Sequence, residues 1–282
     1  MNLSALFLAS AALALVAPAS LVAQPAAPHD TVDPTVPTQL PRTAVPHHYA
    51  ITVTPHAERL TFDATVAIDL DVIKPTSQLV LNAAEMTISS ARLTPAKGGA
   101  ALVGRVTLDP KAETATISFP RTLSTGAYRL ALVYSGKIHT QANGLFALDY
   151  KNKEGKDARS LFTQFEAADA RRFVPSWDEP DYKATWDLTA RVPANTMAVG
   201  NMPAASSKAL PGGLKEVKFQ TTPIMSSYLL FFADGDFDRI TKPAGDREVG
   251  VVMSRGNGPK GQLALDAEEL SVAELVAGVT VG

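Results

Sequence analysis

Two polar side chains near the middle of the chain, Gln164 and Glu166, have the types and the spacing to bind a cation. They flank Phe165 in the stretch TQFE, and alternate residues of an extended backbone share one face, so Phe165 would face the other way. A carboxylate beside an amide can hold an ammonium group through charge-assisted hydrogen bonds. Spacing alone does not distinguish such a pair from ordinary exposed residues.

A dense set of charges follows this pair in residues 167–180. Two interpretations are open: the charges belong to a reaction centre, or they neutralise one another and hold the segment in shape. We favour the second, because three carboxylates are available for two arginines and prolines stiffen the backbone between them. The residues expected to play this structural part are Asp169, Arg171, Arg172, Asp178, Glu179 and Pro180.

The rest of the sequence offers no complete catalytic set. A zinc peptidase helix needs the pattern H-E-x-x-H, and none of the five histidines precedes a glutamate. His47 and His48 are adjacent, so in a strand they should point to opposite faces and could hardly chelate one metal. The absence of cysteine excludes disulfides and thiolate chemistry. We therefore expect no catalytic residue, no metal site and no cofactor in this chain.

Alternating hydrophobicity predicts the elements that must position Gln164 and Glu166. In residues 60–73, apolar side chains occupy every second position and Thr or Asp most of the others, which is typical of a strand with one wet face. Strands with one solvent-exposed face, joined by turn-rich connections, favour an antiparallel sandwich over a buried parallel sheet. Residues 260–277 have helical spacing instead. The other predicted strands are 49–53, 78–83, 114–119, 128–134, 185–192, 215–222 and 227–237.

Residues 160–203 resemble the signature of the aminopeptidase N family of zinc metallopeptidases, the gluzincin aminopeptidases. The family pattern T-Q-x-E-x-x-D-A-R-R-x-x-P-x-x-D-E-P-x-x-K-A is matched throughout, and V-P and N-M-P follow in order. Flanking stretches at 46–55, 134–150 and 225–238 are similar as well. The matched positions are Thr163, Gln164, Glu166, Asp169, Ala170, Arg171, Arg172, Pro175, Asp178, Glu179, Pro180, Lys183, Ala184, Val192, Pro193, Asn201, Met202 and Pro203.

This resemblance implies a fold and a role. The implied fold is all-β, a saddle-shaped antiparallel β-sandwich that caps a zinc peptidase domain, with a short C-terminal helix starting a truncated catalytic domain. By resemblance, Glu166 binds the free α-ammonium group of a peptide, and Gln164 lines the pocket for its first side chain. The family motifs G-x-M-E-N and H-E-x-x-H are absent from these residues. Zinc would then belong to a parent enzyme, and this chain alone would be inactive.

The chain divides into four predicted parts. Residues 1–23 are typical of a secretory signal peptide, because a short apolar run ends in small residues, with cleavage expected after Ala19 or Ala23. We therefore expect an exported protein, periplasmic or secreted, without a membrane span after cleavage. Proline-rich residues 24–45 predict an extended linker. The β domain should cover 46–257, and the truncated start of the zinc peptidase domain 258–282.

The expected partners follow from charge and resemblance. The formal net charge of −2 gives no reason to expect nucleic acid, whereas the resemblance implies peptide N-termini and the missing catalytic domain. The alternative is a stand-alone, non-catalytic β-sandwich binding module. In such a module Phe173, Trp177 and the helix at 260–277 should be covered or polar, whereas in part of a larger enzyme they should form an exposed apolar patch.

Overall fold

The structure is a computed structural model that describes residues 39–244 and 247–266. The predicted signal peptide and most of the predicted linker lie outside the described residues. The chain is helical from Gln262 to Asp266, so the predicted helix begins where expected. The rest of the predicted helix, residues 267–277, lies outside the described residues. Among the described residues, no helix has both the length and the apolar character needed to span a bilayer.

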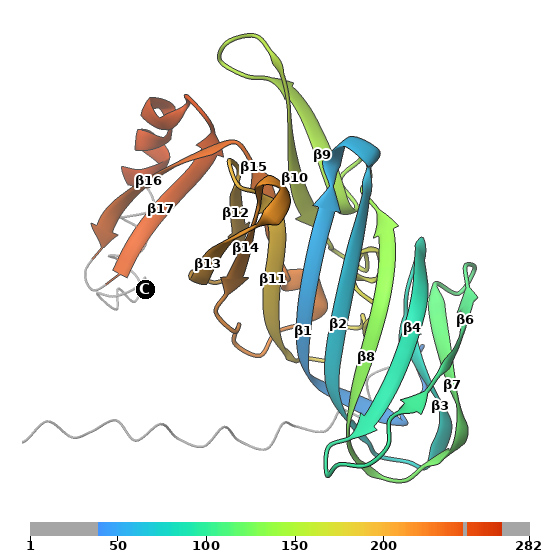
Figure 1. Ribbon diagram of the computed structural model, residues 1–282. Helices are drawn as coiled ribbons and strands as arrows, with labels where there is room; N and C mark the ends of the chain where they lie inside the picture. Colours follow the sequence, from blue (N-terminus) through green and yellow to red (C-terminus); the bar gives the residue numbers. More distant parts are fainter. Residues whose placement is uncertain (1–38, 245–246, 267–282) are drawn as a thin grey trace, which may run out of the picture. The chain divides into compact units, whose positions relative to one another are not determined.

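The described residues form four β-sheets, with short 3₁₀ turns between some of the strands (Figure 1). The largest sheet has eight strands in the order β13-β14-β11-β1-β2-β8-β4-β5, and the others are β12-β15-β10-β9, β3-β7-β6 and β16-β17. The all-β fold expected from the sequence is confirmed. The strands are β1 Ala44–His56, β2 Thr61–Val72, β3 Thr76–Asn82, β4 Met86–Pro95, β5 Leu102–Val103, β6 Arg105–Asp109, β7 Thr114–Leu123, β8 Gly126–Lys137, β9 Gly144–Lys151, β10 Asp157–Gln164, β11 Thr185–Pro193, β12 Met197–Gly200, β13 Ala204–Leu210, β14 Leu214–Phe219, β15 Phe232–Gly235, β16 Phe237–Ala244 and β17 Arg247–Ser254; the 3₁₀ turns are η1 Ala57–Arg59, η2 Ala170–Arg172, η3 Pro211–Gly213, η4 Ser227–Leu229 and η5 Gly258–Gly261.

The interior of the large sheet follows from the period-two pattern of β2. Its residues alternate between buried and more exposed along the strand, and the buried set is Phe62, Ala64, Val66, Ile68, Leu70 and Val72. One hydrophobic cluster joins these side chains to the inner faces of the three- and four-stranded sheets. Burial of each large apolar side chain contributes roughly 1.5–3 kcal/mol, so the cluster holds three of the sheets together.

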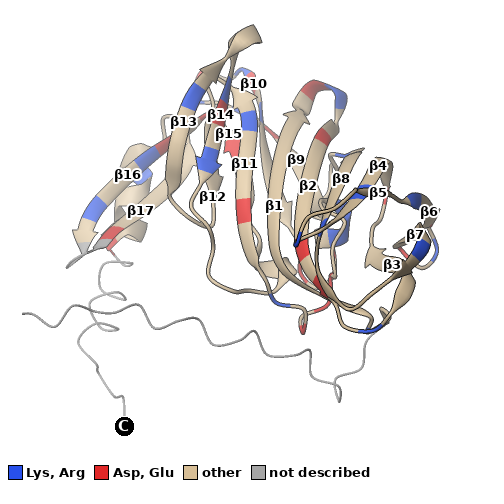
Figure 2. Cartoon of the chain, turned by 60° about the horizontal axis from the view of Figure 1, so that its bottom comes forward, with Lys and Arg blue, Asp and Glu red and all other residues tan. Residues whose placement is uncertain are grey.

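Basic and acidic residues are interspersed along the strands (Figure 2), and some of them pair across neighbouring strands. Arg129 of β8 lies opposite Asp69 of β2, and its Nε and Nη2 each donate to one carboxylate oxygen of Asp69. Arg159 of β10 does the same with Asp149 of β9. Such cross-strand pairs stabilise the register of the sheet modestly.

The large sheet contains one parallel pair, which the antiparallel expectation did not include. β1 runs parallel to β11, with Tyr49 beside Trp186. Their rings stack with centroids 4.0 Å apart and planes inclined by 7°. The 128 residues between the two strands include the complete three-stranded sheet and the strands β9 and β10, and so form a long crossover of the kind that a parallel pair needs.

Two local predictions about the first strand need correction. β1 begins at Ala44, within the range assigned to the linker, and Leu40 and Ala44 are already part of the buried core. The register of β1 against β2 shifts between Pro46 and His48, which is a β-bulge at His47. A bulge adds one residue to a strand and so interrupts the alternation of faces that was predicted for His47 and His48. Both histidines are half-buried and neither enters the core.

The predicted strand at 227–237 is also wrong in its first half. Residues Ser227–Leu229 form the turn η4, and only Phe232–Gly235 continue as a strand before β16 begins. The hydroxyls of Ser226 and Ser227 donate to Pro180 and Asp178 instead of facing solvent. Serine side chains that bond elsewhere in this way compete with a regular ladder, which the apolar pattern of the sequence does not reveal.

Candidate functional site

Gln164 and Glu166 lie where β10 ends. Gln164 is the last residue of β10 and lies opposite Gly144, the first residue of β9. The preceding residue, Thr163, is buried and fastens this end of β10 to β15: its hydroxyl accepts from the backbone N–H of Phe232 at 2.9 Å. The strand end that presents Gln164 is therefore fixed from both neighbouring strands.

Glu166 is carried by a short closed loop. The backbone N–H of Asp169 donates to the carbonyl oxygen of Phe165 at 2.9 Å, which closes the loop, and the Glu166–Ala167 peptide bond is cis. Phe165 is buried against Phe173, with ring centroids 5.5 Å apart. Gln164 and Glu166 are both exposed, and their side chains have no hydrogen-bond or ion-pair partner among the described residues. Phe165 thus faces inward while the two polar side chains face solvent, as the spacing predicts.

Arg172 holds the base of this loop by contacting three carboxylates. Its Nε donates to Asp169 at 2.8 Å, and its two terminal nitrogens donate to Glu85 at 2.5 Å and to Glu113 at 2.8 Å. Burial alone would lower the pKa of Arg172, but the hydrogen bond to Asp169 and the charges of Glu113 and Glu85 raise it. The arginine stays charged and joins the loop to the β3–β4 and β6–β7 connections.

Arg171 forms a second, more deeply buried knot with Asp178. Both the backbone N–H and the Nε of Arg171 donate to Oδ2 of Asp178, at 3.2 and 3.0 Å. The other oxygen of Asp178 accepts from the hydroxyl of Ser227, and its backbone N–H donates to Asn82. The carboxylate of Asp178 thus accepts three hydrogen bonds in a buried place, and removing one partner of this ion pair would leave an unpaired buried charge.

Glu179 and Pro180 fix the segment at its far end. Oε1 of Glu179 accepts from the backbone N–H groups of Gln39 and Leu40, at 2.9 and 3.1 Å, and so anchors the start of the described chain. The carbonyl oxygen of Pro180 accepts from the hydroxyl of Ser226 at 2.8 Å. Every charged residue of the signature from Asp169 to Glu179 thus contacts the protein itself, through these bonds and those of Asp169, Arg171, Arg172 and Asp178.

Glu85 lies beside three basic side chains, those of Lys137, His139 and Arg172. Burial would raise the pKa of Glu85, but the nearby positive charges of Arg172 and Lys137, and of His139 when it is protonated, lower it overall. His139 lies 3.6 Å from Glu85, and burial lowers the pKa of its imidazole more than that carboxylate raises it. The histidine is therefore held mainly neutral at pH 7, and Arg172 and Lys137 supply the charges that balance Glu85.

Sequence reasoning missed Glu85 and Glu113, which complete the cluster under the Glu166 loop. They come from segments more than fifty residues away from Arg172. Both have left-handed backbones, with φ of 51° and 53°, a conformation that costs free energy in residues other than glycine and is found at sites where surrounding structure imposes it. No spacing or composition signal in the sequence marks either residue.

Phe173 and Trp177 do not form an exposed patch. Both are fully buried; the ring of Phe173 contacts those of Phe62, Phe165 and Phe232, with centroids 5.5 to 6.5 Å apart. The backbone N–H of Trp177 donates to the hydroxyl of Tyr49. These aromatic side chains connect the signature to the large sheet and to β15, so by the criterion set above they are covered by the chain's own core.

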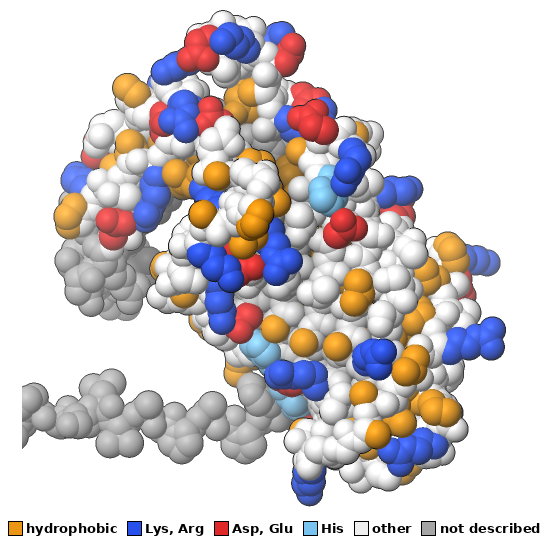
Figure 3. Space-filling view, viewed as in Figure 1, with side chains coloured by type: hydrophobic (Ala, Val, Ile, Leu, Met, Phe, Trp, Pro, Cys, Tyr) orange, Lys and Arg blue, Asp and Glu red, His pale blue; other side chains and the backbone are white. Residues whose placement is uncertain are grey.

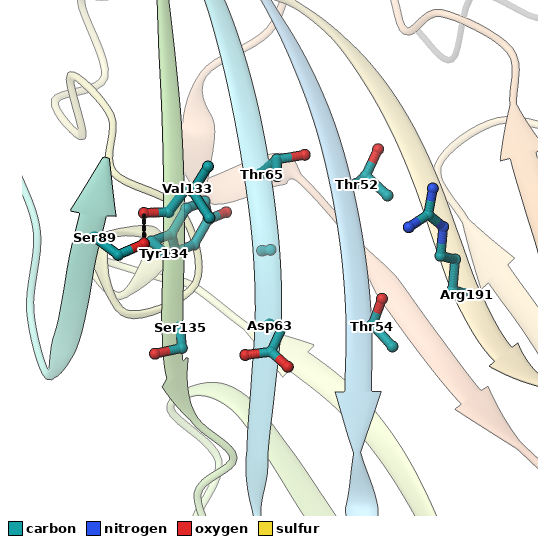
Figure 4. A pocket seen from close by; sticks show the side chains of 10 residues that line it. Thr52, Thr54, Asp63, Thr65, Ser89, Val133, Tyr134, Ser135 and Arg191 are labelled. Atoms are coloured by element: carbon teal, nitrogen blue, oxygen red, sulfur yellow. Dashed lines mark hydrogen bonds between the residues drawn. The ribbon is translucent and has the colours of Figure 1, made fainter. Parts of the chain in front are cut away.

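A hollow of about 390 Å³ on the large sheet is a second candidate site (Figure 4). Hydroxyl groups line much of it, from Thr52 and Thr54 of β1 to Ser135 of β8. Its charged side chains are already paired, because Asp63 bonds His56 and Arg191 bonds Glu216. Figure 3 shows hydrophobic side chains over β1, β2 and β8 only as small separate spots. The hollow has neither an unpaired charge nor a sizeable apolar wall to anchor a ligand.

The described residues do not fit a metal ion. No three His, Asp or Glu side chains of residues 39–244 and 247–266 are grouped as metal ligands. His47 and His48 instead bond Asp71 and Thr185, at 2.9 and 2.8 Å. Asp71 belongs to β2 and Thr185 to β11, so each of these histidines of β1 forms a hydrogen bond to a neighbouring strand of the sheet.

Comparison with known proteins gives the family. The Peptidase M1 N-terminal domain matches residues 45–229. Aminopeptidase N of Acetobacter pasteurianus is 38% identical over 231 residues, which cover 82% of this chain and 64% of that protein. Aminopeptidase M1 of Arabidopsis thaliana is 37% identical over 231 residues, 80% of this chain and 26% of that protein. Puromycin-sensitive aminopeptidase of Caenorhabditis elegans is 33% identical over 230 residues, 81% of this chain and 24% of that protein.

The matched region contains the exposed loop of the candidate site and the charged residues that hold it in place. It includes the loop with Gln164 and Glu166, the two arginines, and the carboxylates Glu85 and Glu113 that bind them. The chain spans less than two thirds of each of these relatives, and about a quarter of the plant and nematode proteins. Family match, relatives and all-β fold agree: the chain belongs to the peptidase M1 family and contains its N-terminal domain.

Proposed function

We propose that this chain recognises the amino-terminus of peptides as the N-terminal capping domain of a zinc aminopeptidase. The observation that carries the proposal is the exposed Glu166, which has no partner among residues 39–244 and 247–266 and lies on a loop fixed by Arg172. Because the loop that carries the carboxylate is already fixed, less ordering of the backbone is needed when it binds an ammonium group, so more of the charge-assisted bond appears as affinity. An internal peptide amide carries no such charge and gains nothing, which favours chain ends.

Gln164 complements this role from the adjacent strand end. Its side chain is exposed like that of Glu166, and Phe165 between the two residues is buried. An amide offers both a donor and an acceptor, so it can contact a peptide beside its ammonium group without competing for the positive charge. We assign Gln164 to the pocket for the first side chain of the substrate.

The catalytic residues of the enzyme are proposed to come from polypeptide outside these 282 residues. The sequence has no H-E-x-x-H or G-x-M-E-N motif, and the described residues offer no group of metal ligands. The described residues therefore do not fit the zinc ion that the family implies. Its own contribution is binding and orientation of the peptide.

The proposal is tested in a joined protein, in which residues 39–266 replace the matched region of the Arabidopsis relative. The substitution Glu166→Gln removes the charge but keeps the shape. Because a hydrogen bond to a charged group is worth about 1.5–3 kcal/mol, KM for an amino-acid p-nitroanilide should rise about 10- to 100-fold. The matched control is Glu58→Gln, a change at an exposed glutamate of η1, which should leave KM unchanged. Equal KM values for the parent and E166Q would refute the role of Glu166.

Export is a separate part of the proposal. The short apolar run and the small residues of 1–23 support a cleaved signal peptide. The mature protein should begin at Ser20 or Gln24, depending on which of the two sites is used. Mass determination of the intact protein purified from the source cells checks this, and a mass that includes Met1 and the apolar run would contradict it.

A stand-alone binding module is the second candidate, because Phe173 and Trp177 are covered by the chain itself. In that case the full chain alone should bind a peptide with a free amino-terminus, and the joined protein should gain nothing from Glu166. Titration of the full chain with Ala-Ala and with N-acetyl-Ala-Ala, followed by NMR, distinguishes the two. Binding of Ala-Ala but not of N-acetyl-Ala-Ala to the chain alone would favour the module.

A further inference from the structure

His139 has a buried ring nitrogen without a hydrogen bond at the edge of the candidate site. Its Nε2 forms no hydrogen bond to residues 39–244 and 247–266, although it lies 3.6 Å from Oε2 of Glu85. Buried polar atoms in folded proteins are normally paired. A nitrogen that ends just short of a carboxylate therefore indicates a hydrogen bond that forms in another protonation state. The charged groups that face the imidazole are Glu85, Arg172, Lys137 and Asp169.

Glu85 offers the same oxygen to His139 and to Arg172. Its Oε2 accepts from Arg172 at 2.5 Å, whereas its Oε1 lies 3.5 Å from Nζ of Lys137. A neutral imidazole is the weaker partner, so Arg172 holds Oε2. A protonated imidazole is a second charged donor beside that oxygen, and charge-assisted hydrogen bonds are roughly twice as strong as neutral ones. The two bases therefore compete for Glu85 once His139 is charged.

Glu85 has room to turn between these partners. It lines a hollow of about 300 Å³, together with Lys137 and the connection between β6 and β7, and its side chain is 39% exposed. Arg172 in contrast keeps two further carboxylates, those of Asp169 and Glu113. Loss of Glu85 would remove one of three attachments, so Arg172 would stay in place but hold the loop less firmly.

His139 also lies close to the strand end that carries Gln164. Gly144 pairs with Gln164 where β9 begins and β10 ends. A Cβ atom at Gly144 would lie 2.9 Å from Cβ of Arg172 and 3.5 Å from Cδ2 of His139. The glycine thus lets both bases approach this strand end. At such short range the charge of the imidazole acts on the polar groups of the site.

We propose that Glu85 and His139 act together as positioning residues for the Glu166 loop, residues 165–169. While His139 is neutral, Glu85 holds Arg172 and the loop is fixed; when His139 gains a proton, Glu85 turns toward it and the loop loosens. This inference rests on the proposed function, because it connects the rigidity of the loop to peptide recognition. Burial holds the pKa of His139 below its ordinary value of 6.5, although the charge of Glu85 acts to raise it. The loop is therefore fixed at neutral pH and loosens in acid.

The same proton acts on the bound peptide as well. A positive imidazole near Gln164 repels the ammonium group that Glu166 is proposed to bind, so both effects weaken recognition at low pH. Binding and protonation are linked reciprocally. A bound ammonium group must therefore lower the pKa of His139 to the same degree that protonation of His139 lowers the affinity.

The first test uses the full chain alone and does not depend on the role of Glu166. The amide of Asp169 closes the loop by donating to Phe165 at 2.9 Å, so its hydrogen exchange reports loosening. We expect its protection, corrected for the intrinsic rate, to fall about fivefold between pH 7.5 and pH 5.5. In His139→Asn this fall should disappear. Protection that changes equally with pH in the parent and in H139N would overturn the inference.

Two further variants separate positioning from general stability. Glu85→Gln keeps the shape of the side chain but removes its charge, so Asp169 should be less protected at both pH values and should show no step between them. The matched control His56→Asn removes a histidine that bonds Asp63 on the large sheet, and the step should remain. A step that survives in E85Q would show that Glu85 does not carry the effect.

The second test measures recognition in the joined protein. His139→Lys places a permanent positive charge beside Glu85, whereas His139→Asn places none. At pH 7.5, KM for the amino-acid p-nitroanilide should be about fivefold higher in the lysine variant, with kcat little changed. If the lysine variant does not fold, KM is compared at pH 5.5 and 7.5 in the parent and in H139N. The rise in KM on acidification should be about fivefold larger in the parent, and equal rises would count against the inference.

The outcome is distinguishable from that of the Glu166 test. Exchange of Asp169 that follows His139, with the same KM for the parent and Glu166→Gln, would support the positioning pair and refute the recognition role. A large effect of Glu166→Gln on KM, with exchange of Asp169 that ignores His139, would retain the recognition role and reject the positioning pair.

Discussion

Asp234 is a buried carboxyl group whose ionisation should destabilise the fold at neutral pH. It lies on β15 and is only 6% exposed. Burial raises the pKa of Asp234 from 3.8 to about 6, although the hydrogen bond from Thr196 and the charge of Lys215 act in the opposite direction. The hydroxyl of Thr196 donates to Oδ1 at 2.6 Å. The replacement Asp234→Asn keeps an oxygen acceptor for Thr196 and removes the charge.

The sign and size of the effect follow from the two pKa values. A folded-state pKa above the unfolded value means that the folded state binds more protons between them, so the free energy of unfolding falls as pH rises from about 4 to about 6. A shift of about two units corresponds to roughly 3 kcal/mol. Well below pH 3.8 the carboxyl is neutral in both states and the penalty vanishes. The Asp234→Asn protein would also lose the attraction between this carboxylate and Lys215, so we expect a gain of about 1–3 kcal/mol at pH 7 and less than about 1 kcal/mol at pH 4.

Urea unfolding at pH 4, 5, 6 and 7 measures this difference. Trp177 and Trp186 are the only tryptophans and both are buried, so their fluorescence reports global unfolding. The control Asp157→Asn changes a carboxylate that is 90% exposed and should alter the free energy of unfolding by less than about 0.5 kcal/mol at every pH. A D234N protein that is less stable than the parent at pH 7, or a difference that does not vary with pH, would refute the reasoning.

Three other expectations concern the signature and the chain as a whole. Replacing Asp178 by Ala leaves Arg171 charged and buried without its main partner, so the free energy of unfolding should fall by about 3–5 kcal/mol; a loss below about 1 kcal/mol in urea would show that the pair is dispensable. Phe173→Ala should cost about 3–5 kcal/mol, because the ring contacts three other aromatic side chains, whereas Phe173→Leu should recover most of it. Glu179→Ala removes the acceptor for the N–H groups of Gln39 and Leu40, so limited proteolysis should cleave near Leu40 faster than in the parent, and an unchanged cleavage pattern would argue against this anchor.

Much of the fold could be read from the sequence because its signal is local. The alternation in β2 depends only on which face of one strand is buried, and the charges of the signature pair with one another within a few positions, as Asp169 and Arg172 do. Pattern reasoning succeeds where the physical cause lies within one element.

The features of the fold and of the candidate site that the sequence did not predict depend on contacts between distant segments. The turn at 227–229 forms because serine hydroxyls reach Asp178 and Pro180, almost fifty residues earlier. The bulge at His47 is defined only against β2. Glu85 and Glu113 become part of the candidate site only when three connections meet at Arg172. None of these partners can be identified from residue spacing, because each is fixed by tertiary packing.

The parallel pairing of β1 with β11 has a consequence for synthesis of the chain. β1 lies between β2 and β11 in the large sheet, and β11 is completed only at Pro193. The ribosome makes the N-terminus first, so β1 and β2 are synthesised long before β11. Tyr49 can stack on Trp186 only after β11 has been made. Pairing over such a sequence distance is slow to form, and an unpaired strand edge invites other chains. A nascent chain that ends before β11 therefore exposes an open sheet edge that the finished molecule hides.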